Sequence, residues 1–369
     1  MIIFNFFYMW FAIFFILPVA GFAYVLWHVW TILPLASVYR WCAVGVGILA
    51  FAMMLMSFGK VTDHLPLGIA KAVYTVGYSS LFILLYLVMA FLLLDLLRLV
   101  HVVPAAWLRS NGTVAAVIAV VMAVVFTAGY INYGVKRCRT VSMSTEKPVG
   151  NGVTLMMLSD LHLGYHIGPG ELTRLVETIN RLRPDAVLIA GDIVDGNIRP
   201  LEEQHLADIL RLVDVPVYAC PGNHEYYAGI EASADFMRRA GITLLRDSMA
   251  DVKGITVIGR DDRSNPHRKS LGALMKGVDK SRYTVLMDHQ PYHLEQAERA
   301  GVDFQLSGHT HHGQLWPVSW ITDAVYEVSH GEYSRGRTHY YVCPGYGLWG
   351  AKFRIGTCSE YAVLRVAGA

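Results

Sequence analysis

The chain has 369 residues, of which 54% are hydrophobic and only 16% are charged. This balance is too apolar for an ordinary soluble protein of this length, and it predicts that part of the chain lies in lipid. The formal net charge of +2 gives no reason to expect nucleic acid as a partner, because nucleic-acid binding usually requires a basic excess or patch. The five cysteines are scattered and form no C-x-x-C pair, which argues against a zinc ribbon or a disulfide framework.

The first part of the chain, residues 1–135, is predicted to be an all-α transmembrane bundle of about four helices that anchors the protein in the lipid bilayer. Each apolar stretch reaches the ~18–20 residues that a bilayer core requires. The first stretch lacks a basic start and is too long for a signal peptide, so we expect a membrane span there and not a cleaved leader. The four spans are expected at about 2–30, 41–59, 73–97 and 113–133.

The charges that flank these spans predict an orientation. With an even number of spans both termini lie on one side, and the more basic side usually faces the cytoplasm. Asp95 and Arg98 have helical i, i+3 spacing near the end of the third span and are expected to form an interfacial pair. The terminal side carries Lys60, Lys71, Lys136, Arg137, Arg139 and Lys147, against Arg40, Arg98 and Arg109 opposite, which favours a cytoplasmic C-terminal domain.

Residues 136–151 are expected to be a linker, and residues 152–369 a domain of class α/β. Short apolar runs alternate there with amphipathic stretches, which is typical of a layered sheet covered by helices. Helices are expected at 170–182 and near 229–240. Strands are expected at 153–158, 186–190, 215–219, 252–259, 283–287, 303–307, 338–343 and 360–366.

Polar motifs follow five of these strands. Ligands of open α/β sheets gather beyond the carboxyl ends of strands, so the five motifs are expected to form one site. Carboxylate, imidazole and amide ligands together suit Mn²⁺, Fe²⁺ or Zn²⁺, and their number implies two ions. The motifs are S-D-L-H (159–162), G-D-I-V-D (191–195), G-N-H-E (222–225), the pair at 288–289, and G-H-T-H-H (308–312).

This ordered set resembles the five sequence blocks of the calcineurin-like metallophosphoesterase superfamily, over about residues 152–368. The resemblance implies a layered α/β/β/α sandwich. The tail of the match, from G-H-T-H-H-G-Q-L-W-P to C-P-G-Y-G-L-W-G-A-K-F-R-I-G, is similar to the bacterial branch that contains the YkuE and YaeI phosphoesterases. In architecture the chain resembles transmembrane proteins with a metallophosphoesterase domain, which implies a multi-pass protein of the bacterial inner (plasma) membrane.

The resemblance also implies roles for individual residues. Two divalent ions, with manganese preferred and iron or zinc as alternatives, would share a hydroxide that attacks phosphorus in line. Asp192 would bridge the ions. One ion would be held by Asp160, His162, Asp192 and His311, and the other by Asp192, Asn223, His289 and His309.

The remaining motif residues are expected beside the ions. His224 would contact the phosphate or protonate the leaving oxygen, and Asp195 would orient its imidazole. Glu225 is a candidate for supporting the ligands from behind. His312 stands where relatives of this branch usually have glycine, either as a tolerated variation or as an extra phosphate contact.

The function expected from these observations is hydrolysis of a phosphodiester or pyrophosphate bond in a phosphorylated lipid or lipid-linked substrate. Gly196 occupies the place of an arginine that protein phosphatases of the superfamily use, which argues against protein phosphatase activity. Trp316, Trp320 and Tyr326 either line an apolar entrance or pack under a loop. Alternatives are a phosphomonoesterase, a non-catalytic scaffold, or a channel regulated by the domain. The scaffold is disfavoured because every ligand position is filled, and the channel because the spans hold few charges.

Overall fold

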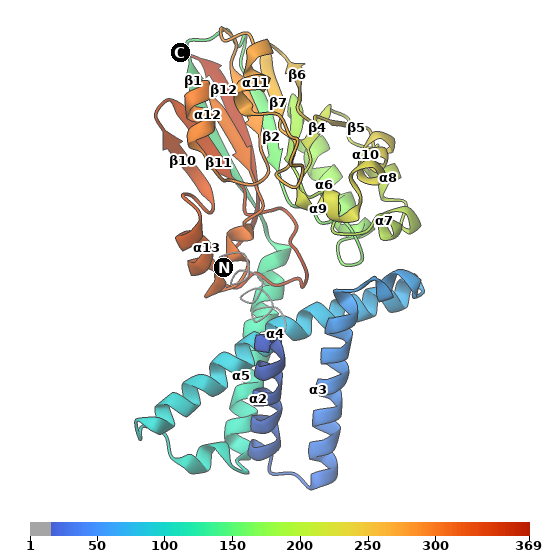
Figure 1. Ribbon diagram of the computed structural model, residues 1–369, viewed down its shortest axis with the longest axis vertical. Coiled ribbons are helices and arrows are strands. Elements are labelled where there is room, and N and C mark those ends of the chain that lie inside the picture. Colours follow the sequence, from blue (N-terminus) through green and yellow to red (C-terminus); the bar gives the residue numbers. More distant parts are fainter. Residues whose placement is uncertain (1–15) are drawn as a thin grey trace. The chain divides into compact units, whose positions relative to one another are not determined.

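The computed structural model describes residues 16–369, which form two compact units (Figure 1). The first unit ends at Gly129 and the second comprises Tyr130–Ala369. The boundary therefore lies within the last apolar helix, a few residues before the expected boundary at 135.

The first unit consists of apolar helices, as the sequence predicted. Helices α3, α4 and α5 are each long and apolar enough to cross a membrane, whereas α2 has only 16 residues. The part of the first predicted span that precedes residue 16 lies outside the described residues. The helices are α2 (Leu17–Ile32), α3 (Ser37–Ser57), α4 (Leu67–Leu99) and α5 (Gly112–Gly134).

Asp95 of α4 has more partners than the sequence predicted. The expected pair with Arg98 forms at 3.6 Å. In addition, the Tyr24 hydroxyl donates a 2.6 Å hydrogen bond to Asp95, and His28 Nε2 lies 3.0 Å from it. Tyr24 and His28 belong to α2, about seventy positions away in the sequence, so helical spacing along α4 could not indicate this contact.

The second unit contains two six-stranded sheets. In the first sheet β2 to β5 run parallel, β12 is antiparallel to β2, and β1 is parallel to β12. Its strands, in spatial order, are β1 (Lys136–Thr145), β12 (Ser359–Gly368), β2 (Val153–Leu158), β3 (Ala186–Ala190), β4 (Val217–Cys220) and β5 (Ile242–Leu244).

In the second sheet the four central strands β11, β9, β8 and β7 are parallel, and an antiparallel strand stands at each edge. Its strands, in spatial order, are β10 (Gly331–Arg335), β11 (Thr338–Val342), β9 (Phe304–Ser307), β8 (Thr284–Met287), β7 (Ile255–Gly259) and β6 (Ser248–Val252).

The two sheets pack face to face with helices outside them. Leu155 and Leu188 of the first sheet share one buried cluster with Val257 and Val285 of the second. Separate clusters join α6 (Pro169–Leu182), α8 (Leu206–Leu210) and α10 (Ile230–Arg239) to the first sheet, and α11 (Leu271–Leu274) and α12 (Glu295–Ala300) to the second. The α/β/β/α sandwich is therefore confirmed. The unit also contains the helices α7 (Arg199–Glu203), α9 (Asn223–Ala228) and α13 (Val318–Val325).

The segment expected as a linker, residues 136–151, differs from the structure. Strand β1 occupies its first ten residues and pairs with β12 along its whole length. Only Val141 of this strand is buried, because β1 is an edge strand. An edge strand can remain polar and still complete a sheet, so the segment shows no apolar run that would mark it as a strand.

Candidate metal centre

The candidate ligands lie at the ends of five strands, as the motifs predicted. Asp160 and His162 follow β2, Asp192 follows β3, and Asn223 follows β4. From the second sheet, His289 follows β8, and His309 and His311 follow β9. The carboxyl ends of parallel strands meet at one edge of a sheet, so the packing of the two sheets brings both sets of ligands together.

The first cluster consists of Asp160, His162 and His311, whose ligand atoms all lie within 4.8 Å of one another. The Nε2 atoms of His162 and His311 are 3.1 Å apart. Asp160 Oδ1 lies 3.5 Å from His311 Nε2 and 3.9 Å from His162 Nε2. Two imidazole nitrogens and a carboxylate oxygen therefore converge on one small volume.

The second cluster consists of Asp192, His289 and His309. His289 Nδ1 lies 2.7 Å from the carbonyl oxygen of Ala190, so it carries the proton, and Nε2 is the acceptor nitrogen. That Nε2 lies 3.1 Å from Asp192 Oδ2. The same carboxylate oxygen is 3.7 Å from His162 Nε2 in the first cluster, so Asp192 lies between the two groups.

Buried polar atoms in this centre lack hydrogen-bond partners. Among the described residues, Asn223 Oδ1 and His289 Nε2 are buried and make no hydrogen bond. A buried polar atom without a partner is costly, and a divalent cation would satisfy both of these lone pairs. Amide oxygen, carboxylate and imidazole also match the ligand preferences of Mn²⁺, Fe²⁺ and Zn²⁺. The residues present therefore fit two divalent ions.

Five candidate ligands have left-handed backbone conformations, with φ between 45° and 71°. This region is unfavourable for residues other than glycine, and such strain collects at functional sites where the surrounding structure enforces it. The residues concerned are Asp160, His162, Asp192, His309 and His311. The turns after β2, β3 and β9 therefore have strained backbones, and this conformation directs the candidate ligands into the centre.

Two motif glycines are required by close approach. A Cβ atom at Gly222 would lie 2.2 Å from Asp192 Oδ1, and one at Gly308 would lie 2.4 Å from Asp160 Oδ2. Both distances are far below any real contact, so a side chain at either position would displace a candidate ligand. Glycine, which has no Cβ, is therefore the residue that fits beside this crowded cluster of candidate ligands.

The surroundings of the candidate ligands shift their pKa values. Burial, together with the charge of His289, lowers the pKa of His309 to about 4. Burial and the charge of His162 also lower the pKa of His311 well below its ordinary value. Burial alone would raise the pKa of Asp192, but nearby histidines outweigh it and hold this pKa well below the usual range. At neutral pH His309 and His311 are thus neutral and Asp192 is ionised, the protonation states that metal binding needs. For His162 and His289 the neighbouring carboxylates outweigh burial and raise the pKa, so a bound cation would have to displace a proton there.

Glu225 contributes more than the sequence indicated. Its fully buried carboxylate accepts hydrogen bonds from the backbone N–H groups of Asp192, Ile193, Val194 and Gly222, at 2.7–3.0 Å. It thereby fixes the turn that carries Asp192. The motif G-N-H-E contains this residue, but the motif alone does not reveal that its carboxylate accepts hydrogen bonds from the backbone.

His224 and Asp195 lie beside the first cluster. The His224 ring packs edge-on against the His162 ring with centroids 4.6 Å apart, and its Nδ1 contacts the backbone carbonyl of Asp195. The Asp195 carboxylate is nearer to His162 Nδ1, at 3.0 Å, than to His224 Nδ1, at 3.9 Å. Asp195 thus contacts both imidazoles, through different atoms.

His312 belongs to a separate cluster. Its ring stacks on His330 with centroids 3.5 Å apart, and its Nε2 lies 3.4 Å from Asp323 Oδ1. The three expected aromatic residues divide into two groups. Tyr326 faces His309 at a centroid distance of 6.4 Å, whereas Trp316 and Trp320 contact each other and are exposed.

Arg354 is a positioning residue that sequence reasoning missed. Its buried guanidinium donates hydrogen bonds to the carbonyl oxygens of His311 at 2.7 Å, Pro344 at 2.6 Å and Gly347 at 3.0 Å. It therefore ties the turn carrying His311 to the loop after β11. The tail motif G-A-K-F-R-I-G contains this arginine, but a charged residue in a loop gives no sign of complete burial.

Comparisons with known proteins agree with this centre. Residues 153–313 match the calcineurin-like phosphoesterase family. An uncharacterized metallophosphoesterase of Aquifex aeolicus is 32% identical over 244 residues, which cover 63% of this chain and 92% of that protein. A transmembrane protein with metallophosphoesterase domain of Danio rerio is 33% identical, covering 57% of this chain and 52% of that protein.

A third relative is the uncharacterized metallophosphoesterase YkuE of Bacillus subtilis, which is 29% identical over 54% of this chain and 73% of its own length. The chain thus spans between about half and nine tenths of the length of these relatives. The resemblance that the motifs indicated is confirmed by these matches.

Proposed function

Since this chain belongs to the calcineurin-like metallophosphoesterase family, we propose that it is a membrane-anchored phosphoesterase that hydrolyses a phosphodiester or pyrophosphate bond. The observation that carries the proposal is the pair of ligand clusters that meet at Asp192. Two divalent ions, manganese in preference to iron or zinc, would supply activation of water and neutralisation of phosphoryl charge. Asp160, His162 and His311 would hold one ion, Asn223, His289 and His309 the other, and Asp192 both.

His224 is proposed to act on the substrate. Its Nδ1 is engaged by the Asp195 carbonyl, which leaves Nε2 to contact a phosphate oxygen or to give a proton to the leaving oxygen. The His162 ring, packed edge-on, holds the plane of this imidazole. Glu225 and Arg354 act through the backbone turns that carry Asp192 and His311.

The proposed substrate is a phosphorylated lipid or a lipid-linked compound. Only strands β1 and β2 separate helix α5 from Asp160, which keeps the centre close in the chain to a helix apolar enough to cross a bilayer. Helix α13 supports the same class, because it follows the His311 turn and exposes the apolar side chains of Trp320, Ile321 and Val325. Such a face is suited to contact with an acyl chain.

The proposed location is a bacterial inner membrane with the catalytic unit in the cytoplasm. The support is the excess of lysine and arginine on the side of the membrane that carries the C-terminal unit. Protease treatment of inside-out and right-side-out vesicles would test it. Degradation of the C-terminal unit in right-side-out vesicles would reverse the orientation.

A substrate assay tests the enzymatic proposal. Purified full-length protein with Mn²⁺ should hydrolyse bis-p-nitrophenyl phosphate faster than p-nitrophenyl phosphate, and Asp192→Asn should abolish both activities. Asp208→Asn, a change at an exposed carboxylate, is the matched control and should remain active. A faster monoester reaction would favour a phosphomonoesterase. Absence of turnover in a folded, metal-loaded protein would favour the scaffold.

The lipid class can be tested separately. Membrane lipid extracts would be incubated with wild-type protein or with Asp192→Asn and then compared by mass spectrometry. A lipid phosphodiester or pyrophosphate that disappears only with the wild-type protein would identify the substrate. If the two extracts were identical although the wild-type protein cleaves bis-p-nitrophenyl phosphate, the lipids of that membrane would be excluded as substrates.

A further inference from the structure

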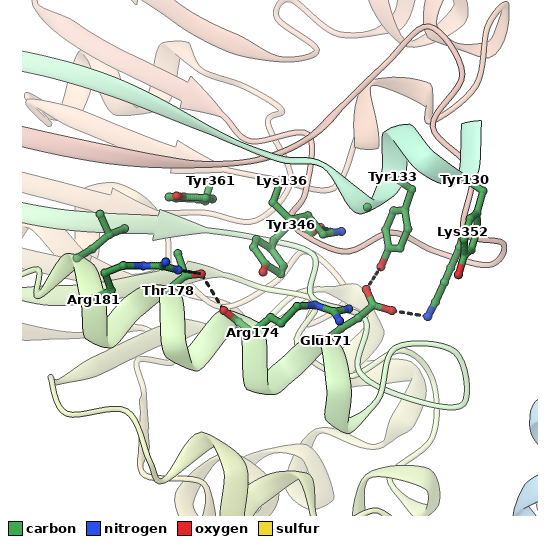
Figure 2. Close-up of a pocket in the computed structure, with 12 residues that line it drawn as sticks. Tyr130, Tyr133, Lys136, Glu171, Arg174, Thr178, Arg181, Tyr346, Lys352 and Tyr361 are labelled. Carbon is green, nitrogen blue, oxygen red and sulfur yellow. Dashed lines mark hydrogen bonds and ion pairs between the residues drawn. The ribbon is translucent and has the colours of Figure 1, made fainter. Parts of the chain in front are cut away.

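A polar cavity lies in the C-terminal unit, outside the candidate metal centre, with a volume of about 410 Å³ (Figure 2). This size is within the range of about 300–1,000 Å³ that is usual for small-molecule sites. Its floor is one face of α6, on which Glu171, Arg174, Thr178 and Arg181 follow one another at helical spacing. Its other walls come from the end of α5, the start of β1, the loop after β11, and β12.

The cavity contains more positive than negative charge. Four cations line it, Lys136, Arg174, Arg181 and Lys352, against the single carboxylate of Glu171. That carboxylate is engaged by the Lys352 ammonium and by the Tyr133 hydroxyl, which Figure 2 shows as dashed lines. Lys352 therefore has its counter-charge, whereas the other three cations have no carboxylate partner among the described residues.

These three cations are available to a ligand. Arg181 donates only a long 3.4 Å hydrogen bond to Thr178, and within the described residues the Arg174 guanidinium makes no hydrogen bond or ion pair. Lys136 donates to the carbonyl oxygen of Tyr346 at 2.9 Å, and its ammonium lies 3.5 Å from the centre of the Tyr133 ring. An ammonium has three donors, so Lys136 is fixed in place yet can still bind an acceptor.

The uncompensated positive charge predicts that an anion binds in this cavity. Guanidinium groups match phosphate oxygens geometrically, and lysine binds phosphate as a point charge. Burial lowers the pKa of Lys136 to about 7. The charge of Glu171 opposes this shift, and the charges of Arg354 and Lys352 reinforce it. An anion in the cavity would offset this desolvation, which is consistent with a pocket that is completed by a ligand.

The walls also indicate where the anion comes from. Tyr130 and Tyr133 lie in the last turn of α5, a 23-residue apolar helix. At a rise of 1.5 Å per residue this helix is about 35 Å long, slightly more than the ~30 Å hydrocarbon core, so its last turn would lie at the level of the headgroups. Tyrosines are enriched at that level, where they contact headgroups and acyl chains together.

We propose that this cavity binds the phosphate group of a lipid headgroup, at a site distinct from the metal centre. Arg174 and Arg181 hold the phosphate oxygens from α6, and Lys136 holds them from β1. Tyr130 lies where the glycerol and acyl chains would emerge. The inference depends on the membrane attachment proposed above but not on catalysis, and the bound lipid would fix the catalytic unit at the membrane surface.

The test measures binding to the full-length protein in detergent. Dihexanoyl phosphatidic acid is the probe, dihexanoyl phosphatidylcholine is the zwitterionic comparison, and inorganic phosphate is the free anion. Wild-type protein should bind phosphatidic acid more tightly than either of the others. Arg174→Ala and Arg181→Ala should each weaken this binding about tenfold, as expected for loss of one charge-assisted hydrogen bond. Arg211→Ala removes a cation that does not line this cavity and should not weaken it.

A second arm separates this site from the metal centre. Asp192→Asn, which removes a proposed metal ligand, should bind phosphatidic acid with unchanged affinity. If Asp192→Asn bound phosphatidic acid more weakly while Arg174→Ala bound it normally, the ligand would be assigned to the metal centre and the proposal would be overturned. Equal affinity for inorganic phosphate would overturn the lipid source. If Asp192→Asn remained hydrolytically active, the proposed function would fail while the lipid site still stood.

Discussion

The imidazoles of His162 and His311 face each other in the candidate metal centre, with their Nε2 atoms 3.1 Å apart. Without a cation, such an approach requires one of the two nitrogens to carry a proton and donate it to the other. Both nitrogens can instead be ligands when a cation lies against them. Asp160 Oδ1, at 3.5 Å from His311 Nε2, is placed to complete the set.

Replacement of His311 by alanine is therefore expected to remove one ion. Metal analysis should fall from two divalent ions per chain to about one, and hydrolysis of bis-p-nitrophenyl phosphate should fall at least about a hundredfold. His267→Ala removes an exposed histidine that is absent from every cluster of possible ligands in the described chain, so it should retain both ions. Unchanged metal content in His311→Ala would refute the assignment of this residue.

Glu225 should be essential for the stability of the Asp192 turn. Its carboxylate accepts four backbone hydrogen bonds, so Glu225→Gln would direct an amide N–H₂ at backbone N–H groups. We expect a loss of roughly 2–4 kcal/mol in the free energy of unfolding and weaker metal binding.

The measurement for Glu225 is thermal unfolding with and without Mn²⁺. Glu231→Gln is the control, because that carboxylate is exposed and pairs only at the surface with Arg246. Equal melting temperatures for Glu225→Gln and Glu231→Gln would show that the buried carboxylate does not support the turn.

Gly222 should not tolerate even a methyl group. A Cβ there would approach Asp192 Oδ1 to 2.2 Å, so Gly222→Ala must displace the carboxylate that is shared by both clusters. A ligand displacement of about 1 Å is expected to reduce kcat about a hundredfold. Gly170→Ala is the matched control, because a Cβ at Gly170 in α6 meets no atom within 4 Å. Full activity in Gly222→Ala would contradict this tight packing against Asp192.

The sequence predicted the positions of the candidate ligands in the fold because each of them closely follows an apolar strand. Strand β2 has the predicted bounds, and Asp160 and His162 lie at its end as expected. In such a case the local pattern and the chemical motif coincide, and the parallel arrangement of the strands determines where the motifs meet. The apolar helices α3 to α5 were recognisable for a similar reason, because lipid requires a long apolar run.

The features that were missed depend on partners distant in the sequence. Strand β1 is polar because it lies at a sheet edge, and its identity as a strand comes from pairing with β12 at the other end of the chain. The burial of Arg354 and the backbone hydrogen bonds of Glu225 likewise arise only when separate loops are packed together. Periodicity and spacing describe local structure and cannot report such contacts.

Lys136 should give the folded protein a distinctive dependence on pH. Burial lowers its pKa from 10.5 to about 7, despite the opposing charge of Glu171. Between these values the unfolded chain binds a proton that the folded protein has released, so the Lys136 contribution makes the free energy of unfolding rise with pH. Below the folded pKa both states are protonated, and the destabilisation by the buried charge is present in full.

Lys136→Met keeps the volume of the side chain but removes the amine. We therefore expect the variant to be more stable than wild type near neutral pH, and this advantage to shrink as the pH is raised from about 7 to about 9. Thermal unfolding of the full-length protein, measured without added lipid across that range, provides the test. Lys276→Met, at an exposed lysine, should show no such trend relative to wild type. A constant difference between Lys136→Met and wild type would mean that Lys136 titrates outside this range, and that its ammonium is not destabilised by burial in the cavity.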